Sequence, residues 1–500
     1  MKQRILKRIF SDHSPGPNGP SSLQLNETLH RLVVGGAWYT TSAIVNRVLP
    51  NLLVIILALL VRPADLGAYS YILAFYTVLS LFADMGIAYA LQKFIQENPL
   101  DAMKIGSTSL VLRFLSSLAL GFLCVGVDQC WTAFKGYSLY VALLLISSAF
   151  GTSIYVLNAR LKYKESSLLV IVRGVLWFVF AIIFVVIGQP VLGPIYSLAM
   201  AFVVIGILTV FLERSYFVLV FDWAYARRIM QFGVLMTIAS AFSVLATQAG
   251  ILVMAYLTTE SEVGIYRLAS TFGMIPMLLG DGLVLPLLPL IKKSFMEAPK
   301  DIPELIRLLI RYLSIIGFLI LGTGVVLAKP LISLVFGPFY QSAVWPLRIL
   351  LGSGCLGLLF TVLLSVSYMS NDLKIAAKIS AVVAGLCLGL SVFLIPLYGA
   401  SGAAIALLVA FGMGLILISR WLSRRLQVYF EWRKYGIYIL SLAETIMMMF
   451  ILFSFVPNLV FHMIGGIIFA PILYLTALFV QKGITGAEIS RMRQILKAKP

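Results

Sequence analysis

The chain has 500 residues, of which 61% are hydrophobic and 12% charged, and its formal net charge is +18. Soluble proteins carry roughly a quarter charged residues, so this composition excludes a soluble globular domain, and a mean hydropathy of +1.00 indicates a chain that crosses the bilayer many times. A nucleic-acid-binding protein is excluded as well, because the basic residues lie in short loops between apolar segments and form no basic domain.

The chain starts with a polar segment, residues 1–30, which we expect to form a cytoplasmic tail. Its stretch SDHSPGPNGPSS (residues 11–22) is rich in proline, glycine and serine and is predicted to be disordered. The first long apolar segment starts near Val33, behind this tail, so the sequence does not predict a cleaved signal peptide.

The apolar segments after the tail predict an all-α integral membrane protein with fourteen spanning helices, since about 20 apolar residues cross the hydrocarbon layer. The expected helices are 33–60, 67–92, 103–127, 137–158, 166–188, 191–213, 229–257, 265–290, 305–328, 343–369, 374–395, 399–420, 435–456 and 460–481.

The distribution of basic residues among the loops agrees with the fourteen predicted spans. Nearly all of them fall on one side of the predicted membrane, and the opposite side holds only Arg62, Lys135 and Lys329. Because basic residues accumulate on the cytoplasmic side of a membrane, both termini are predicted to be cytoplasmic. The loops on the outer side are shorter than a folded domain, which needs about 50 residues.

Two stretches of the chain form an internal repeat. RPADLGAYSYILAFYTVLSLFADMG (62–86) aligns without gaps with TESEVGIYRLASTFGMIPMLLGDG (259–282), and the alignment pairs glycines, tyrosines and aspartates. Chance similarity of leucine-rich segments is the alternative, but the paired positions are not leucines. Six predicted helices separate the copies, so the halves have the same orientation and form a parallel repeat, an arrangement that places a transporter's substrate site between the halves.

The repeat divides the chain into predicted units. After the tail come an N-terminal six-helix bundle (31–214), a C-terminal six-helix bundle (215–425), an additional helix pair (426–482) and a second cytoplasmic tail (483–500).

Polar side chains recur at helical spacing inside the predicted spans and indicate a substrate-binding site. We expect Arg47, Asn51, Gln248 and Arg267 to bind substrate, and the repeat pairs Asn51 with Gln248. An arginine within the bilayer costs at least about 2.5–3.5 kcal/mol and usually faces a cavity or a partner. Local pairing or snorkelling to the interface is the alternative for Arg47 and Arg267.

Other intramembrane arginines are interpreted as structural, because they lie nearer to predicted helix ends or on less polar faces: Arg113, Arg173, Arg311 and Arg348.

Asp84 and Asp281 occupy equivalent positions in the two copies of the repeat. One interpretation is a carboxylate that caps a break in its helix beside Gly86 or Gly282. The other is a coupling or gating group, as a proton or sodium site or a salt bridge that opens and closes one face. The four cysteines form no CxxC pair and the three histidines are scattered, so the sequence predicts no metal site and no cofactor.

Four stretches carry a resemblance to a known family: RPADLGAYSYILAFYTVLSLFADMGIAYALQKF, LTTESEVGIYRLAS, VFGPFYQSAVWPLRIL and IPLYGASGAAIAL. The chain resembles the polysaccharide-biosynthesis flippases of the multidrug/oligosaccharidyl-lipid/polysaccharide exporter superfamily over about residues 30–425. The pattern is diffuse and contains no catalytic signature.

The resemblance implies two six-helix bundles around a cationic cavity, with alternating access. It implies an undecaprenyl-pyrophosphate-linked oligosaccharide as substrate, moved to the outer leaflet of the bacterial cytoplasmic membrane by a monomer, and a polysaccharide polymerase or export machinery as partners. Residues 426–482 would be the extra helix pair that forms a lipid groove. Related lipid II flippases use arginines on helices 1 and 8, which match Arg47 and Arg267 by position.

Three alternatives differ from this function. A lipid II flippase would share the mechanism and differ in the head group. A multidrug cation antiporter of the same superfamily would need an acidic cavity, whereas the predicted spans hold more cations than carboxylates. A membrane polymerase or ligase would need a long outer catalytic loop, which the sequence lacks, so we expect a transporter and not an enzyme.

Overall fold

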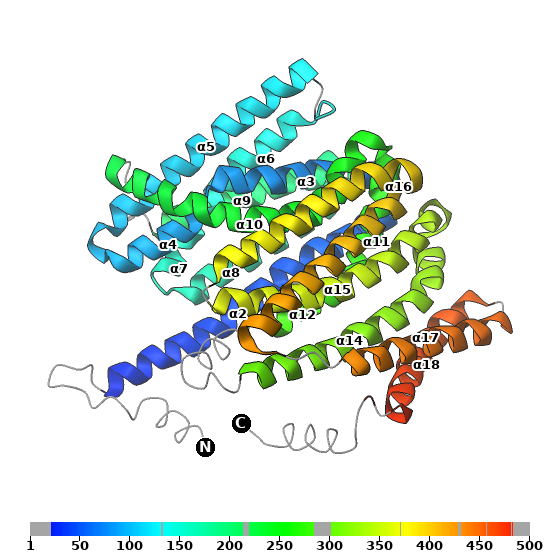
Figure 1. Cartoon of the computed structure of the whole chain (residues 1–500). Helices are drawn as coiled ribbons and strands as arrows, with labels where there is room; N and C mark the ends of the chain where they lie inside the picture. Colours follow the sequence, from blue (N-terminus) through cyan, green and yellow to red (C-terminus); the bar gives the residue numbers. More distant parts are fainter. Residues whose placement is uncertain are drawn as a thin grey trace.

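The computed structural model describes residues 22–131, 134–213, 220–284, 302–370, 372–428, 432–456, 458–481 and 483. Within these residues the protein is helical and contains no strand (Figure 1). Eleven of the described helical segments are long and apolar enough to cross a membrane. The predicted all-α membrane fold is therefore confirmed, whereas the count of fourteen spans and the cytoplasmic location of the termini stay predictions.

The first half of the chain forms these helices: α2 (Ser22–Leu60), α3 (Pro63–Asp84), α4 (Ile87–Glu97), a 3₁₀ turn (Pro99–Asp101), α5 (Ala102–Trp131), α6 (Ser138–Gly151), α7 (Ile154–Ala159), α8 (Tyr163–Val186) and α9 (Leu192–Leu212). The second half forms α10 (Trp223–Leu257), α11 (Glu260–Gly273), α12 (Ile275–Val284), α14 (Ile302–Leu331), a π turn (Ile332–Phe336), a 3₁₀ turn (Pro338–Ala343), α15 (Val344–Met369), α16 (Leu373–Leu426), α17 (Trp432–Ser454) and α18 (Leu459–Val480).

The helix bounds correct the sequence prediction in several places. Helix α2 begins at Ser22, so residues 22–30 are helical and do not belong to an irregular tail, as the range 1–30 implied. The rest of that tail and residues 484–500 lie outside the described residues. The predicted helix 67–92 ends instead at Asp84, because Met85 and Gly86 adopt the left-handed conformation (φ 44° and 68°) before α4 starts.

Further breaks divide the helices. The predicted helix 137–158 is divided between Gly151, where α6 ends, and Ile154, where α7 begins. The predicted helix 265–290 is divided at Met274, where Pro276 in the next turn has no N–H to continue the hydrogen-bond pattern. Helix α16 contains Gly399 at φ 53°, and a Cβ atom on Gly402 would lie 2.2 Å from the carbonyl oxygen of Leu394. The chain therefore turns back at Gly399, and α16 contributes two antiparallel arms (Figure 1), as the ranges 374–395 and 399–420 predicted.

The helices pack in two groups with an added pair. In the first group α2 packs on α8, α8 on α9, and α5 and α9 on α6; in the second, α16 packs on α10 and α15, and α14 on α15. Helices α17 and α18 pack on each other and on α14, at the edge of the molecule (Figure 1). The two groups meet mainly through α3, which contacts both α10 and α11.

The internal repeat forms the contact between the two groups. A Cβ atom on Gly67 would lie 1.7 Å from the Glu260 carbonyl oxygen, and one on Gly264 would lie 1.9 Å from the Pro63 carbonyl oxygen. The repeat pairs Pro63 with Glu260 as well as Gly67 with Gly264, so each copy presents the same two positions to the other. Glycine is required at both positions because α3 and α11 cross at backbone distance.

Side-chain contacts reinforce this crossing. The Tyr137 hydroxyl donates a hydrogen bond to Glu260 Oε1 (3.2 Å), and the Tyr340 hydroxyl donates one to the Val61 carbonyl oxygen (3.4 Å). Burial and the nearby Glu260 carboxylate raise the pKa of Tyr137, so its phenol remains a hydrogen-bond donor at neutral pH. The two groups of helices are thus closed against each other at the start of α3.

Candidate functional site

A polar chamber of about 660 Å³ lies at the opposite end of α3. Helices from the first group form most of its wall, and α10 closes it from the second group. Its polar side chains include Ser80, Asp84, Gln92, Arg113, Ser148, Asn158 and Arg173, and its aromatic side chains include Tyr39, Tyr76, Tyr155 and Phe202.

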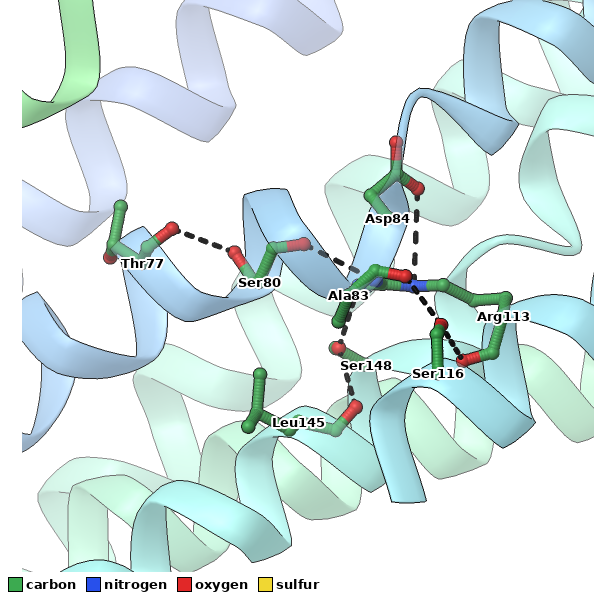
Figure 2. A network of polar contacts seen from close by, with 8 residues as sticks. All are labelled: Thr77, Ser80, Ala83, Asp84, Arg113, Ser116, Leu145 and Ser148. Atoms are coloured by element: carbon green, nitrogen blue, oxygen red, sulfur yellow. Dashed lines mark hydrogen bonds and ion pairs between the residues drawn. The ribbon is translucent and has the colours of Figure 1, made fainter. Parts of the chain in front are cut away.

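Arg113 on α5 is held against the end of α3 (Figure 2). Its Nη1 donates a hydrogen bond to the Ser80 carbonyl oxygen and its Nη2 donates one to Ser148 Oγ, each at 3.1 Å. Its Nε lies 3.9 Å from Asp84 Oδ1, and the residue is 5% exposed. A buried guanidinium needs such partners, because removing it from water without them costs several kcal/mol.

Asp84 is the last residue of α3, directly before the break that separates α3 from α4, and it contacts Arg113. Its carboxylate lies beside the backbone of Gly86 and Ala88, at the start of α4, while it faces the guanidinium. The side chain is 25% exposed, toward the chamber. Asp84 therefore lies at a helix break and is paired with Arg113 there. Its role in coupling or gating stays a prediction.

Arg173 on α8 is the second cation of the chamber. Its Nη2 donates a hydrogen bond to Asn46 Oδ1 on α2 (3.0 Å), and its guanidinium lies 5.0 Å from the centre of the Phe202 ring. Both partners are neutral, so the charge of Arg173 is not cancelled by them. With two guanidiniums and one carboxylate among its lining side chains, the described chamber has a net positive charge.

A second, smaller cavity brings together three of the four residues predicted to bind substrate. It has a volume of about 190 Å³ and is lined by Asn51, Gln248 and Arg267, with Thr247 and Ser270 beside them. The buried Arg267 Nε has no hydrogen-bond partner among the described residues.

Arg47 and Asp281 complete the predicted site residues. Arg47 is exposed on α2, between Asn46, which binds Arg173, and Asn51, whose amide donates to the Arg47 carbonyl oxygen at 2.8 Å. Asp281 lies in α12, and its side chain is outside the described residues.

Arg113 and Arg173, which were interpreted as structural from the sequence, both line the chamber of about 660 Å³. A signal was available for Arg113, because Ser109, Ser116 and Ser117 flank it at helical spacing on α5. Arg348, by contrast, donates to the Val325 carbonyl oxygen and packs on Trp345, as a structural arginine would.

Comparison with known proteins identifies the family. The family model of the polysaccharide biosynthesis proteins matches residues 32–295, more than half of the chain. The chain belongs to this family. The resemblance noted in the sequence is therefore confirmed.

Individual proteins are similar to this chain over most of its length. The chain is 22% identical over 426 residues to the "Probable low-salt glycan biosynthesis flippase" of Haloferax volcanii, covering 83% of the chain and 88% of the relative. The fold is similar to that of the lipid II flippase MurJ, with a TM-score of 0.71 at 12% identity over 88% of this chain and 97% of the other. It is also similar to an inward-facing multidrug transporter of the MATE family, with a TM-score of 0.62 at 16% identity over 76% and 95% of the two chains.

Proposed function

We propose that this protein flips an undecaprenyl-pyrophosphate-linked oligosaccharide from the inner to the outer leaflet of the bacterial cytoplasmic membrane, for the synthesis of a surface polysaccharide. The observation that carries the proposal is the net positive charge of the polar chamber, whose charged lining side chains are Arg113, Arg173 and one carboxylate, Asp84. The name of the Haloferax relative and the family description support it.

The chamber suits a pyrophosphate chemically. A guanidinium binds phosphate oxygens through two parallel hydrogen bonds, and this pairing is strengthened where water is excluded. Arg173 offers a charge whose partners among the described residues, Asn46 and Phe202, are neutral. Arg113 would exchange its 3.9 Å contact with Asp84 for a contact with the anion.

The surrounding hydroxyl and amide groups suit the sugars. Side chains such as Gln92, Thr152 and Asn158 line the same chamber and can exchange hydrogen bonds with sugar hydroxyls. We propose that Asn51, Gln248 and Arg267 serve the same substrate at a later stage of the crossing, and that Arg47 on α2 contacts it between the two cavities.

In alternating access, the end of the bundle that is closed would open while the opposite end closes. The contact of Gly67 with Gly264 closes the bundle at the end of α3 remote from the chamber, and the proposed cycle opens this contact and closes the chamber end. We propose that the basic loops and both termini face the cytoplasm, that the protein acts as a monomer, and that it delivers its product to a polymerase or to export machinery.

A multidrug cation antiporter is disfavoured, because a net positive chamber repels cationic drugs. A lipid II flippase uses the same pyrophosphate chemistry, so the identity of the accumulated lipid has to separate it from the proposal.

The proposal is tested by analysing lipid-linked intermediates in a deletion strain. We expect undecaprenyl-linked oligosaccharide to accumulate on the inner leaflet and to disappear when the wild-type gene is restored. Accumulation of lipid II would instead assign the protein to peptidoglycan synthesis, and unchanged levels of both lipids would overturn the proposal.

A further inference from the structure

An apolar crevice of about 440 Å³ lies next to the polar chamber. The end of α3 forms its floor, and α5 and α10 form its sides. Its lining is Phe82, Met85, Ser116, Ala119, Leu120, Val234, Thr237 and Ile238, so that, apart from two hydroxyl side chains, its wall is apolar.

The crevice is accessible from the outside of the helix bundle. Phe82 is 46% exposed, Val234 39% and Ile238 50%. Helices α3 and α5 belong to spans that are long and apolar enough to cross the bilayer. The crevice is therefore open to an apolar chain that lies along the outside of these helices.

The crevice and the chamber meet at one residue and share the same three helices. Thr237 on α10 lines both of them. At the end of α3, Asp84 lines the chamber and the next residue, Met85, lines the crevice. On α5, Arg113 lines the chamber, and Ser116, about one turn further along, lines the crevice. A cationic site and an apolar slot thus lie on the two sides of a single helix end.

This juxtaposition selects a ligand with an anionic head attached to a long hydrocarbon chain. We infer that the crevice between α3, α5 and α10 holds the first isoprene units of the substrate's polyprenyl chain while the pyrophosphate occupies the chamber. The inference rests on the proposed function and adds to it the place where the chain leaves the protein.

A second apolar groove provides the alternative. It has a volume of about 370 Å³ and lies between α11, α12, α14, α15 and α18, where Phe272, Leu319 and Leu351 line it. Among the described residues, none that lines this groove also lines the chamber or the smaller polar cavity. A chain in this groove would therefore be separated from the guanidiniums of the chamber by packed helices.

Photo-crosslinking separates the two places. We would introduce a benzophenone amino acid at Ile238 in the crevice or at Ile320 in the groove, reconstitute each protein in nanodiscs, and add tritiated undecaprenyl pyrophosphate. We expect at least five times more labelling from position 238, and loss of that labelling with excess unlabelled undecaprenyl pyrophosphate. Stronger labelling from position 320, or labelling from 238 that excess ligand does not displace, would overturn the inference.

The same experiment distinguishes failure of the inference from failure of the proposed function. Binding of undecaprenyl pyrophosphate with labelling at 320 alone would contradict only the crevice. An absence of displaceable binding to the whole protein would contradict the proposed function, and the crevice with it.

Filling the crevice gives a second, independent readout. Ala119→Trp places an indole in the crevice, and Thr323→Trp places the same group in the groove as a matched control. We expect Ala119→Trp to weaken binding of undecaprenyl pyrophosphate at least tenfold and to leave binding of geranyl pyrophosphate, with its ten-carbon chain, within twofold. Because the short-chain ligand tests whether the chamber is intact, an equal loss for both ligands would indicate general disruption and would contradict the inference, as would a selective loss in Thr323→Trp.

Discussion

Asp84 has two separable tasks, and each belongs to a different partner. Its carboxylate lies beside the backbone N–H groups at the start of α4, and it is the counterion of Arg113. An asparagine retains an oxygen that can accept from the backbone but carries no charge. The two tasks can therefore be separated by comparing asparagine and alanine at this position.

We predict that Asp84→Asn binds inorganic pyrophosphate more tightly than the wild type, by up to about tenfold or ~1.4 kcal/mol. The substitution removes the carboxylate that competes with the anion for Arg113. Isothermal titration calorimetry of the purified protein measures this change. Weaker binding by the asparagine variant would show that Asp84 supports the site rather than competing with the ligand.

Stability should respond differently to the two substitutions. We predict that Asp84→Ala lowers the free energy of unfolding by about 0.5–2 kcal/mol, because the first turn of α4 loses its acceptor, and that Asp84→Asn lowers it less. Thermal unfolding of both variants in the same detergent gives the comparison. Equal destabilisation of the two would argue that the charge, and not the cap, stabilises this break.

The sequence predicted individual residues unevenly. Asn51, Gln248 and Arg267, which lie on α2, α10 and α11, line one cavity. Helical spacing could indicate the polar face of each helix but not that the three faces meet. Arg113 and Arg173 were assigned to structure, since their chamber forms only when helices distant in sequence pack together. The position of each arginine along its helix predicted that it lies within the membrane, but it did not predict which cavity the side chain lines.

At the scale of elements, the helix crossing of α3 and α11 explains why the repeat preserves glycine. No side chain fits at Gly67 or Gly264 without moving a backbone carbonyl group of the other helix. The sequence identified these paired glycines but could not show that they touch each other. The sequence suggested the break beside Gly86 only as one of two interpretations, because the apolar pattern of residues 67–92 continues through it.

We predict that Gly67→Ala opens the crossing. Labelling by a membrane-impermeant maleimide, added from outside, of a single cysteine placed at the buried Ser70 should rise several-fold on a background without the four native cysteines. The control is Gly385→Ala in α16, where no atom lies within 4 Å of the added Cβ. This control should leave labelling unchanged and stabilise its helix by about 0.5–1 kcal/mol. Unchanged labelling in Gly67→Ala would contradict closure at this crossing.

At the scale of the whole molecule, two helix groups with a repeated scaffold carry an unequal distribution of charge. The first group supplies the large chamber with Arg113 and Arg173, whereas the smaller cavity of the second group holds Arg267. The sequence predicts parallel halves, which stay a prediction, and the structure places the paired Gly67 and Gly264 against each other. The inequality of the two cavities depends on side-chain packing across many helices, which no sequence pattern reports.

The central claim is that the chamber's guanidiniums carry a lipid-linked pyrophosphate across the membrane. The most direct measurement is the initial rate at which an undecaprenyl-pyrophosphate-linked oligosaccharide becomes accessible on the opposite face of proteoliposomes. We predict that Arg173→Gln lowers this rate at least tenfold, while Arg62→Gln, which changes an exposed arginine before α3, retains it. Equal rates for the wild type and Arg173→Gln, with both proteins folded and correctly inserted, would contradict the account.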